Sequence, residues 1–212
     1  MNDLPTLKIH LFGKHKVGKT TLRNKIISGN ENIESTKFIE LSTKTINDKY
    51  TLLLVDYPGD TKGANLFDYL DSAGIIFLIY DITNPKSFHD LKRDWIYALK
   101  EKNMKNGDTN KILVIANKND LYNSKDYSDF VEEDEGKEFA KEIGADFLSI
   151  SLKNGDENKI LTYFEEKFKL NDFEDKKDIN DIKDVNDLKD VNDLKDKINI
   201  KEEGSSYYCS FY

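Results

Sequence analysis

The sequence predicts an α/β fold: one domain over residues 1–170, with a mostly parallel six-stranded sheet, one antiparallel strand and helices on both faces. Three observations support this prediction. Strand-like and helix-like apolar patterns alternate along the chain. Residues 13–20 form a glycine-containing loop of the kind that holds phosphate, placed between a strand pattern and a helix pattern. Residues 171–212 differ in composition and are predicted to form a largely disordered tail.

The first three strands follow from periodicity and turn residues. Apolar and polar residues alternate over residues 7–11, which predicts a strand. The helix that follows the loop ends at Gly29-Asn30, because both residues tolerate the left-handed backbone that closes a helix. Residues 39–46 and 50–55 are predicted to be two strands joined by a turn at Asn47-Asp48, a hairpin that precedes the return to parallel topology.

The second half of the domain continues the alternation. Residues 74–80 and 111–116 are continuous apolar runs, the pattern of central strands that are covered on both faces. A helix begins at Asn84-Pro85, and its apolar residues at helical spacing are Phe88, Leu91, Trp95 and Leu99. The remaining predicted elements are helices over residues 131–143 and 156–168 and a strand over residues 147–150. In such a sheet, ligands bind at the carboxyl ends of the strands.

The loop Gly13-Lys14-His15-Lys16-Val17-Gly18-Lys19-Thr20 has two glycines separated by four residues and followed by Lys and Thr. Glycines let successive backbone N–H groups converge on anionic oxygens, and the positive end of the following helix adds to the field. Lys19 would then reach the terminal phosphates, while the Thr20 hydroxyl would ligate Mg²⁺. The alternative is a turn before a helix with no ligand.

Composition argues against several classes of function. A net charge of −8 disfavours a nucleic-acid binder that works by broad phosphate neutralisation. The longest apolar run, around residues 73–80, is too short to cross a bilayer, and the polar N-terminus lacks the apolar core of a secretory signal. The single cysteine, Cys209, excludes an internal disulfide and agrees with a reducing compartment. We therefore expect a cytoplasmic protein.

The tail beyond Leu170 is acidic and repetitive. It holds twelve Asp and Glu against seven Lys, and residues 180–197 are three copies of a six-residue repeat. Apolar residues at every third position drift around a helix of 3.6 residues per turn, so they form no continuous apolar face. Residues 171–212 are accordingly predicted to be low-complexity and largely disordered.

A second polar stretch, Asn117-Lys118-Asn119-Asp120, follows the predicted strand over residues 111–116. It would emerge at the carboxyl edge of the sheet, beside the phosphate loop. A carboxylate there can accept two hydrogen bonds from the N1–H and N2 amine of guanine, a pair that adenine does not offer. Taken alone, such a stretch in a sequence rich in Asn, Lys and Asp is more readily a plain polar turn. Its position after a buried strand, at the right distance from the phosphate loop, favours base recognition instead.

Taken together, these motifs resemble those of Ras-superfamily small GTPases, most closely the Rab family, over about residues 7–169. The stretches that carry the resemblance are the phosphate loop, Tyr80-Asp81-Ile82-Thr83 with Ser87-Phe88 and Trp95, Asn117-Lys118-Asn119-Asp120, and Ser151-Leu152-Lys153. The resemblance implies binding of GTP and GDP with Mg²⁺, hydrolysis of GTP, and a two-state switch that regulates membrane traffic.

The resemblance also implies roles for individual residues. Asn117 would brace the loops, the Lys118 stem would pack on the base, Asp120 would read guanine, and the Leu152 N–H would meet the guanine oxygen. Thr36 would close onto Mg²⁺ and the γ-phosphate, and the Gly59 N–H would sense the γ-phosphate. The implied nucleotide-binding set is His15, Lys16, Val17, Gly18, Lys19, Thr20, Thr21, Thr36, Asp56, Gly59, Asn117, Lys118, Asp120, Ser151, Leu152 and Lys153. The implied metal set is Thr20, Thr36 and Asp56, with Asp56 acting through water, and the implied catalytic set is Lys19, Thr36, Gly59 and Asp60.

Several positions depart from the family pattern. Asp60 stands where the family usually has the Gln that orients the attacking water. Ionised Asp is shorter and only accepts hydrogen bonds, so slow hydrolysis is expected; the alternative is that Asp60 acts as a base. Pro58 stiffens this loop. His15 and Lys16 replace small residues, and His15 lies where an activating protein's arginine would need room; alternatively, both are solvated side chains.

The tail leaves membrane attachment open. Cys209 is fourth from the end, a prenylation position, but the acidic tail would not assist docking on anionic lipid, and a free thiol is the alternative. We expect a monomer, peripheral on the cytosolic face of membranes if lipidated, with an exchange factor, an activating protein and effectors as partners. The competing functions are a pseudo-GTPase scaffold and, disfavoured by the guanine-reading acid, a P-loop ATPase or nucleotide kinase.

Overall fold

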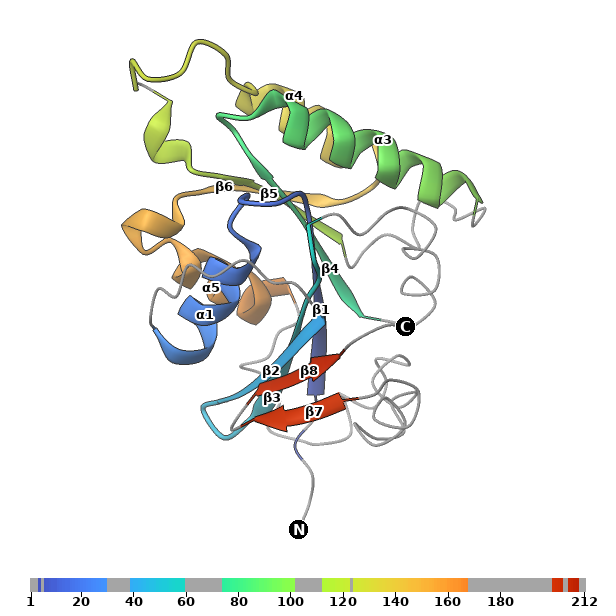
Figure 1. The fold of residues 1–212 in the computed structure, drawn as a ribbon, viewed down its shortest axis with the longest axis vertical. Helices are drawn as coiled ribbons and strands as arrows, with labels where there is room; N and C mark the ends of the chain where they lie inside the picture. Colours follow the sequence, from blue (N-terminus) through green and yellow to red (C-terminus); the bar gives the residue numbers. More distant parts are fainter. Residues whose placement is uncertain are drawn as a thin grey trace.

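The computed structural model describes residues 4, 6–29, 39–59, 74–101, 112–122, 124–167, 200–203 and 206–209. Its strands form a single sheet in the order β6-β5-β4-β1-β3-β2-β8-β7 (Figure 1). The first six in chain order are β1 (Thr6–Phe12), β2 (Ile39–Ile46), β3 (Tyr50–Asp56), β4 (Ile75–Asp81), β5 (Ile112–Asn117) and β6 (Asp146–Ile150). Only β2 among them is antiparallel to its neighbour, β3. The predicted α/β fold with six such strands is confirmed.

In the described part of the chain, four α-helices cover the two faces of the sheet: α1 (Lys19–Ser28), α3 (Pro85–Glu101), α4 (Glu133–Glu142) and α5 (Glu157–Lys167). Figure 1 shows α3 and α4 together on one side of the sheet and α1 and α5 together on the other. Each pair has its own apolar core. Trp95 of α3 and Phe139 of α4 belong to one cluster, whereas Leu22 of α1 and Phe164 of α5 belong to the other. No helix in the described part of the chain is long and apolar enough to span a membrane.

Local backbone chemistry explains most of the boundaries. Asn47 and Asp48 both have positive φ, 49° and 55°, as the tight turn between β2 and β3 requires. Gly29 closes α1 at φ 72° and donates its N–H to the Lys25 carbonyl. The predicted helix over residues 131–143 begins later than expected. Val131 instead donates its N–H to the Ile82 carbonyl at 2.9 Å, and a capping box at Glu132 starts α4.

Strand β1 is more buried than its alternating pattern suggests. It lies between β3 and β4, and its apolar residues belong to the cores on both faces of the sheet, Phe12 to one and Leu7, Ile9 and Leu11 to the other. Lys8 and His10, the polar residues of the alternation, are 6% and 1% exposed. Burial lowers the pKa of Lys8 and, together with the Lys8 charge, lowers the pKa of His10 to about 3. These two side chains are therefore held in a mainly apolar setting at the centre of the molecule.

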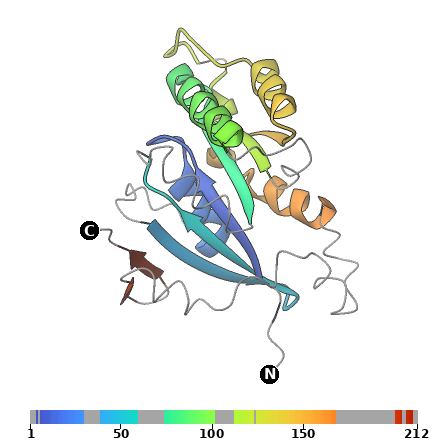
Figure 2. The same cartoon turned by 90° about the vertical axis from the view of Figure 1, so that its right-hand side faces the viewer.

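The tail contributes two strands that the sequence did not predict. Strands β7 (Ile200–Glu203) and β8 (Ser206–Cys209) form an antiparallel hairpin, and β8 pairs with the first residues of β2. In Figure 2 this hairpin, coloured red, lies beyond β2 at the edge of the sheet. The prediction of a largely disordered tail therefore does not hold for these eight residues. The repeat over residues 180–197 lies outside the described residues, so its predicted disorder stays a prediction.

Candidate nucleotide-binding site

The phosphate-loop sequence connects β1 to α1 at the carboxyl edge of the sheet. Gly13 and Gly18 both have positive φ, 149° and 106°. A Cβ at Gly13 would lie 2.2 Å from the carbonyl oxygen of Ile79, and one at Gly18 would lie 2.3 Å from Nδ2 of Asn117. Both the backbone conformation and the available space therefore require glycine at these two positions.

Lys19 is the first residue of α1 and is 6% exposed. Its Nζ donates hydrogen bonds to the carbonyl oxygens of Gly13 at 2.9 Å and Lys14 at 3.0 Å. These bonds hold the ammonium group across the loop, at the positive end of the α1 dipole. A cation and a helix N-terminus thus meet at one place, which is an arrangement suited to anionic oxygens.

An oxygen-rich corner lies on the β3 side of the loop. The Thr20 hydroxyl donates to Oδ2 of Asp56 at 2.7 Å, and Asp56 is fully buried at the end of β3. Arg23 lies 3.8 Å from the same carboxylate oxygen and also forms an ion pair with Glu40 of β2. The structure thus brings together Thr20 and Asp56, two of the three residues predicted for the metal site.

Asn117, at the end of β5, links the phosphate loop to the loop after β6. Its Nδ2 donates to the Val17 carbonyl at 2.8 Å, and its Oδ1 accepts the Leu152 N–H at 3.3 Å. Asn117 is 2% exposed, so both bonds are shielded from water. The amide therefore fixes the distance between two loops that are far apart in the sequence.

The residues predicted to contact the base lie around Asn117. Lys118 has φ 70° and its Nζ forms an ion pair with Asp81 at 2.5 Å. Asp120 accepts a hydrogen bond from the Ser151 hydroxyl at 2.6 Å. These contacts join the ends of β4, β5 and β6 at one edge of the sheet. Asp120 is thereby oriented by a neighbour from a different loop.

The loop after β6 is itself fixed by Asp156. The fully buried Ser151 donates its N–H to Oδ2 of Asp156 at 2.8 Å. Burial opposes ionisation of Asp156, but the hydrogen bonds from Ser151 and Lys159 outweigh it and lower the pKa of this carboxyl group. Leu152 is buried beside Gly18, whereas Lys153 is exposed.

Comparison with known proteins agrees with this geometry. A sequence model described as the Ras family matches residues 8–170. The chain belongs to the Ras family. Its relatives include Ras-related protein Rab-31 of Mus musculus, 32% identical over 161 residues, which cover 73% of this chain and 78% of the relative. Ras-related protein SEC4 of Saccharomyces cerevisiae is 30% identical over 157 residues, which cover 71% of this chain and 68% of the relative. Ras-related protein RabY of Dictyostelium discoideum is 28% identical over 156 residues, with coverages of 69% and 62%.

The chain is thus a Rab-like small GTPase by descent, and its switch positions are described only in part. Thr36 and Asp60 lie outside the described residues. Gly59 is described and packs on the phosphate loop: a Cβ there would lie 2.3 Å from the backbone N of His15. The side chains of His15 and Lys16 are exposed, while Thr21 is partly buried in the first turn of α1.

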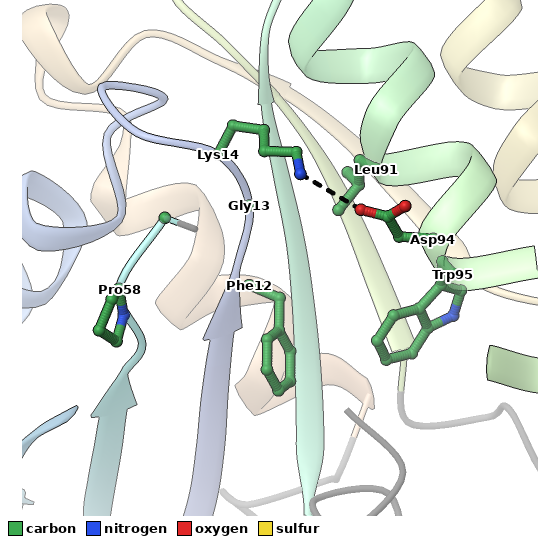
Figure 3. Close-up of a pocket in the computed structure, with 8 residues that line it drawn as sticks. Phe12, Gly13, Lys14, Pro58, Leu91, Asp94 and Trp95 are labelled. Carbon is green, nitrogen blue, oxygen red and sulfur yellow. Dashed lines mark hydrogen bonds and ion pairs between the residues drawn. The ribbon is translucent and has the colours of Figure 1, made fainter. Parts of the chain in front are cut away.

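Four residues around the site of this Ras-family protein were not singled out from the sequence. Lys14 of the phosphate loop forms a 3.2 Å ion pair with Asp94 of α3 across a small cavity of about 30 Å³ (Figure 3). His10 of β1 hydrogen-bonds Tyr57, which follows Asp56 directly. The partners in these pairs are 80 and 47 residues apart, and no local spacing signals either contact.

Proposed function

We propose that this chain binds GTP and GDP with Mg²⁺ and acts as a nucleotide-dependent switch. The proposal depends on the two hydrogen bonds of the Asn117 side chain, one to Val17 and one to Leu152. They tie the phosphate loop to the loop that orients Asp120. A phosphate cradle and a purine-reading carboxylate on one edge of the sheet suit a single guanine nucleotide. Members of the Ras family generally bind such nucleotides, which supports the same conclusion.

The residues present fit this ligand. Lys19 and the backbone of residues 16–21 would hold the phosphates. Thr20 and Asp56 offer the hard oxygen atoms that Mg²⁺ prefers. The described residues contain no group of three or more His, Cys, Asp or Glu side chains arranged for a metal, so Mg²⁺ would also depend on phosphate oxygens and on Thr36.

On the base side, Asp120 would accept from guanine while the Ser151 hydroxyl orients it. Lys118 would lay its aliphatic stem on the base, because its ammonium group is held by Asp81. The Leu152 N–H already faces Asn117 at 3.3 Å, a long bond that it would share with the guanine oxygen.

The assignment is tested most directly by denaturing the purified full-length protein and identifying the nucleotide released. GDP or GTP in near-stoichiometric amount is expected. Release of an adenine nucleotide, or no binding of guanine nucleotide after exchange in excess ligand, would refute it. Retained guanine nucleotide without turnover would favour the pseudo-GTPase scaffold, which keeps the binding part of the proposal.

Hydrolysis is proposed to be slow, because Asp60 cannot donate a hydrogen bond to orient the attacking water. Asp60→Gln is expected to raise the single-turnover rate by about tenfold, the gain from one further transition-state hydrogen bond. Asp60→Asn is the matched control, since it removes the negative charge but keeps the side chain one methylene shorter than that of Gln. An equal gain in both variants would assign the effect to charge, and no gain in either would contradict the proposal.

We further propose a role in membrane traffic, on the resemblance to the Rab family, with effectors recognising the GTP-bound form. Attachment to the cytosolic face of membranes would require lipidation of Cys209. Mass spectrometry of the protein from its native source tests this, with an unmodified thiol as the opposing result.

A further inference from the structure

Tyr57 lies between two residues that face the proposed nucleotide. Asp56, on one side of it, accepts a hydrogen bond from Thr20. Gly59, two residues beyond it, lies so close to the phosphate loop that a Cβ would be 2.3 Å from the backbone N of His15. The path between the acid and the glycine therefore consists of Tyr57 and Pro58 alone. Pro58 has a fixed φ and no N–H to donate, and Tyr57 brings a large aromatic side chain that reaches into the core.

Tyr57 is anchored in the core rather than exposed. It is 2% exposed, and its ring stacks on Phe12 with a centroid distance of 4.6 Å and an interplanar angle of 10°. Phe12 in turn packs on Trp95 of α3 at 5.8 Å. Phe12 and Trp95 line the cavity where Lys14 meets Asp94 (Figure 3). A residue of a nucleotide-sensing loop is thus built into the apolar layer between β1 and α3.

The hydroxyl group of Tyr57 has a specific partner. It lies 2.8 Å from Nδ1 of His10, and the two rings also stack at 5.7 Å. Burial and the nearby Lys8 charge lower the pKa of His10 to about 3, so the imidazole is neutral near pH 7. Its Nε2 has no hydrogen-bond partner among the described residues. Among the described residues, the bond to Tyr57 is therefore the side-chain hydrogen bond of the buried His10 ring, and it satisfies Nδ1.

We propose that Tyr57 is a positioning residue for γ-phosphate recognition: through its bond to His10 and its stacking on Phe12, it holds the Gly59 N–H against the phosphate loop. This inference rests on the proposed function as a GTP-binding switch. GDP has no γ-phosphate to contact Gly59, so the anchor contributes to GTP affinity and leaves GDP affinity nearly unchanged. Tyr57 would thereby set the preference of the protein for GTP over GDP.

The test is Tyr57→Phe in the full-length protein, which removes the hydroxyl and keeps the ring. Dissociation constants for GDP and for a non-hydrolysable GTP analogue are measured with Mg²⁺ present. The ratio of GTP-analogue affinity to GDP affinity is expected to fall about tenfold below that of the wild type, the effect of one hydrogen bond. Tyr163→Phe is the matched control. Tyr163 lies on α5, which packs on the opposite face of the sheet, and its hydroxyl donates to Asp146 of β6 at 2.5 Å. It should leave the ratio unchanged.

A second variant separates positioning from stability. Tyr57→Phe alone leaves Nδ1 of His10 buried without a partner, which should lower the melting temperature. Combining it with His10→Phe removes the ring nitrogens as well, so the melting temperature should return toward that of the wild type. The ratio of affinities should stay low, because the anchor bond is still missing. Equal weakening of both nucleotides in Tyr57→Phe, an unchanged ratio, or recovery of the ratio in the double variant would overturn the inference. A wild-type protein that binds no guanine nucleotide would instead refute the proposed function.

Discussion

Asp120→Asn is expected to weaken GDP binding by about 10²- to 10⁴-fold and to shift the preference of the protein toward xanthine nucleotides. The Asp120 carboxylate would accept two hydrogen bonds from guanine, each worth about 1.5–3 kcal/mol because the acceptor is charged. The Ser151 hydroxyl, 2.6 Å from Oδ1, would hold the asparagine carbonyl oxygen in the same place and turn its amine toward the base. That amine opposes the guanine N2 amine but can donate to the carbonyl oxygen that xanthine carries at the same carbon.

Fluorescent guanine and xanthine diphosphates, titrated in parallel, measure the change. Asp126→Asn is the matched control, because it removes the same negative charge from an exposed residue six positions further along the chain. It should leave both affinities within about twofold of wild type, as expected for a surface substitution. If Asp120→Asn keeps its GDP affinity, or if it fails to bind xanthosine diphosphate, Asp120 does not read the base.

Gly18→Ala is expected to abolish tight nucleotide binding, with a loss of at least about 100-fold. The new Cβ would lie 2.3 Å from Nδ2 of Asn117, so the amide must move away from Val17 and Leu152. Losing those buried bonds costs about 1–3 kcal/mol each, and the left-handed backbone at φ 106° adds about 1–2 kcal/mol. Nucleotide affinity and the melting temperature of the nucleotide-free protein are the two measurements.

Gly29→Ala supplies the comparison, because Gly29 also has positive φ, 72°, but a Cβ there meets nothing within 4 Å. It carries only the backbone cost of about 1–2 kcal/mol, so it should lower stability and spare affinity. The two variants together distinguish loss of the Asn117 bridge from general strain. Equal affinity losses in both would show that the bridge is not what holds the ligand site together.

The sequence predicted those parts of the fold that depend on local patterns. The limits of β2 match the prediction because its alternation ends in a turn with a specific backbone requirement at Asn47 and Asp48. The start of α4 was missed because the capping box fixes Glu132 in an extended conformation, with φ −64° and ψ 147°, so the helix begins only after it. The burial of both Lys8 and His10 was also not predictable from the sequence, since only the strand order places β1 at the centre of the sheet.

The candidate site likewise has features that local sequence patterns predict and features that depend on long-range contacts. The phosphate loop and Asn117 were predictable because contiguous residues carry their chemistry. The anchoring of Tyr57 by His10 and the pairing of Lys14 with Asp94 depend on which strands and helices become neighbours. A pair of residues at such separations leaves no trace in a single sequence. The hydrogen bond between Ser151 and Asp120 was predicted only in part. The sequence identified the two stretches that contain these residues, but not their direct contact.

The C-terminal hairpin changes what the β2 side of the molecule offers to other proteins. In the sheet, β8 pairs with Ile39, Glu40 and Leu41, the residues that begin β2. A backbone edge that is already paired cannot accept a further chain, whether from a binding partner or from a misassembled copy of the same protein. Any polypeptide that adds itself alongside these three residues must therefore compete with the protein's own C-terminal segment, which is always present at high local concentration.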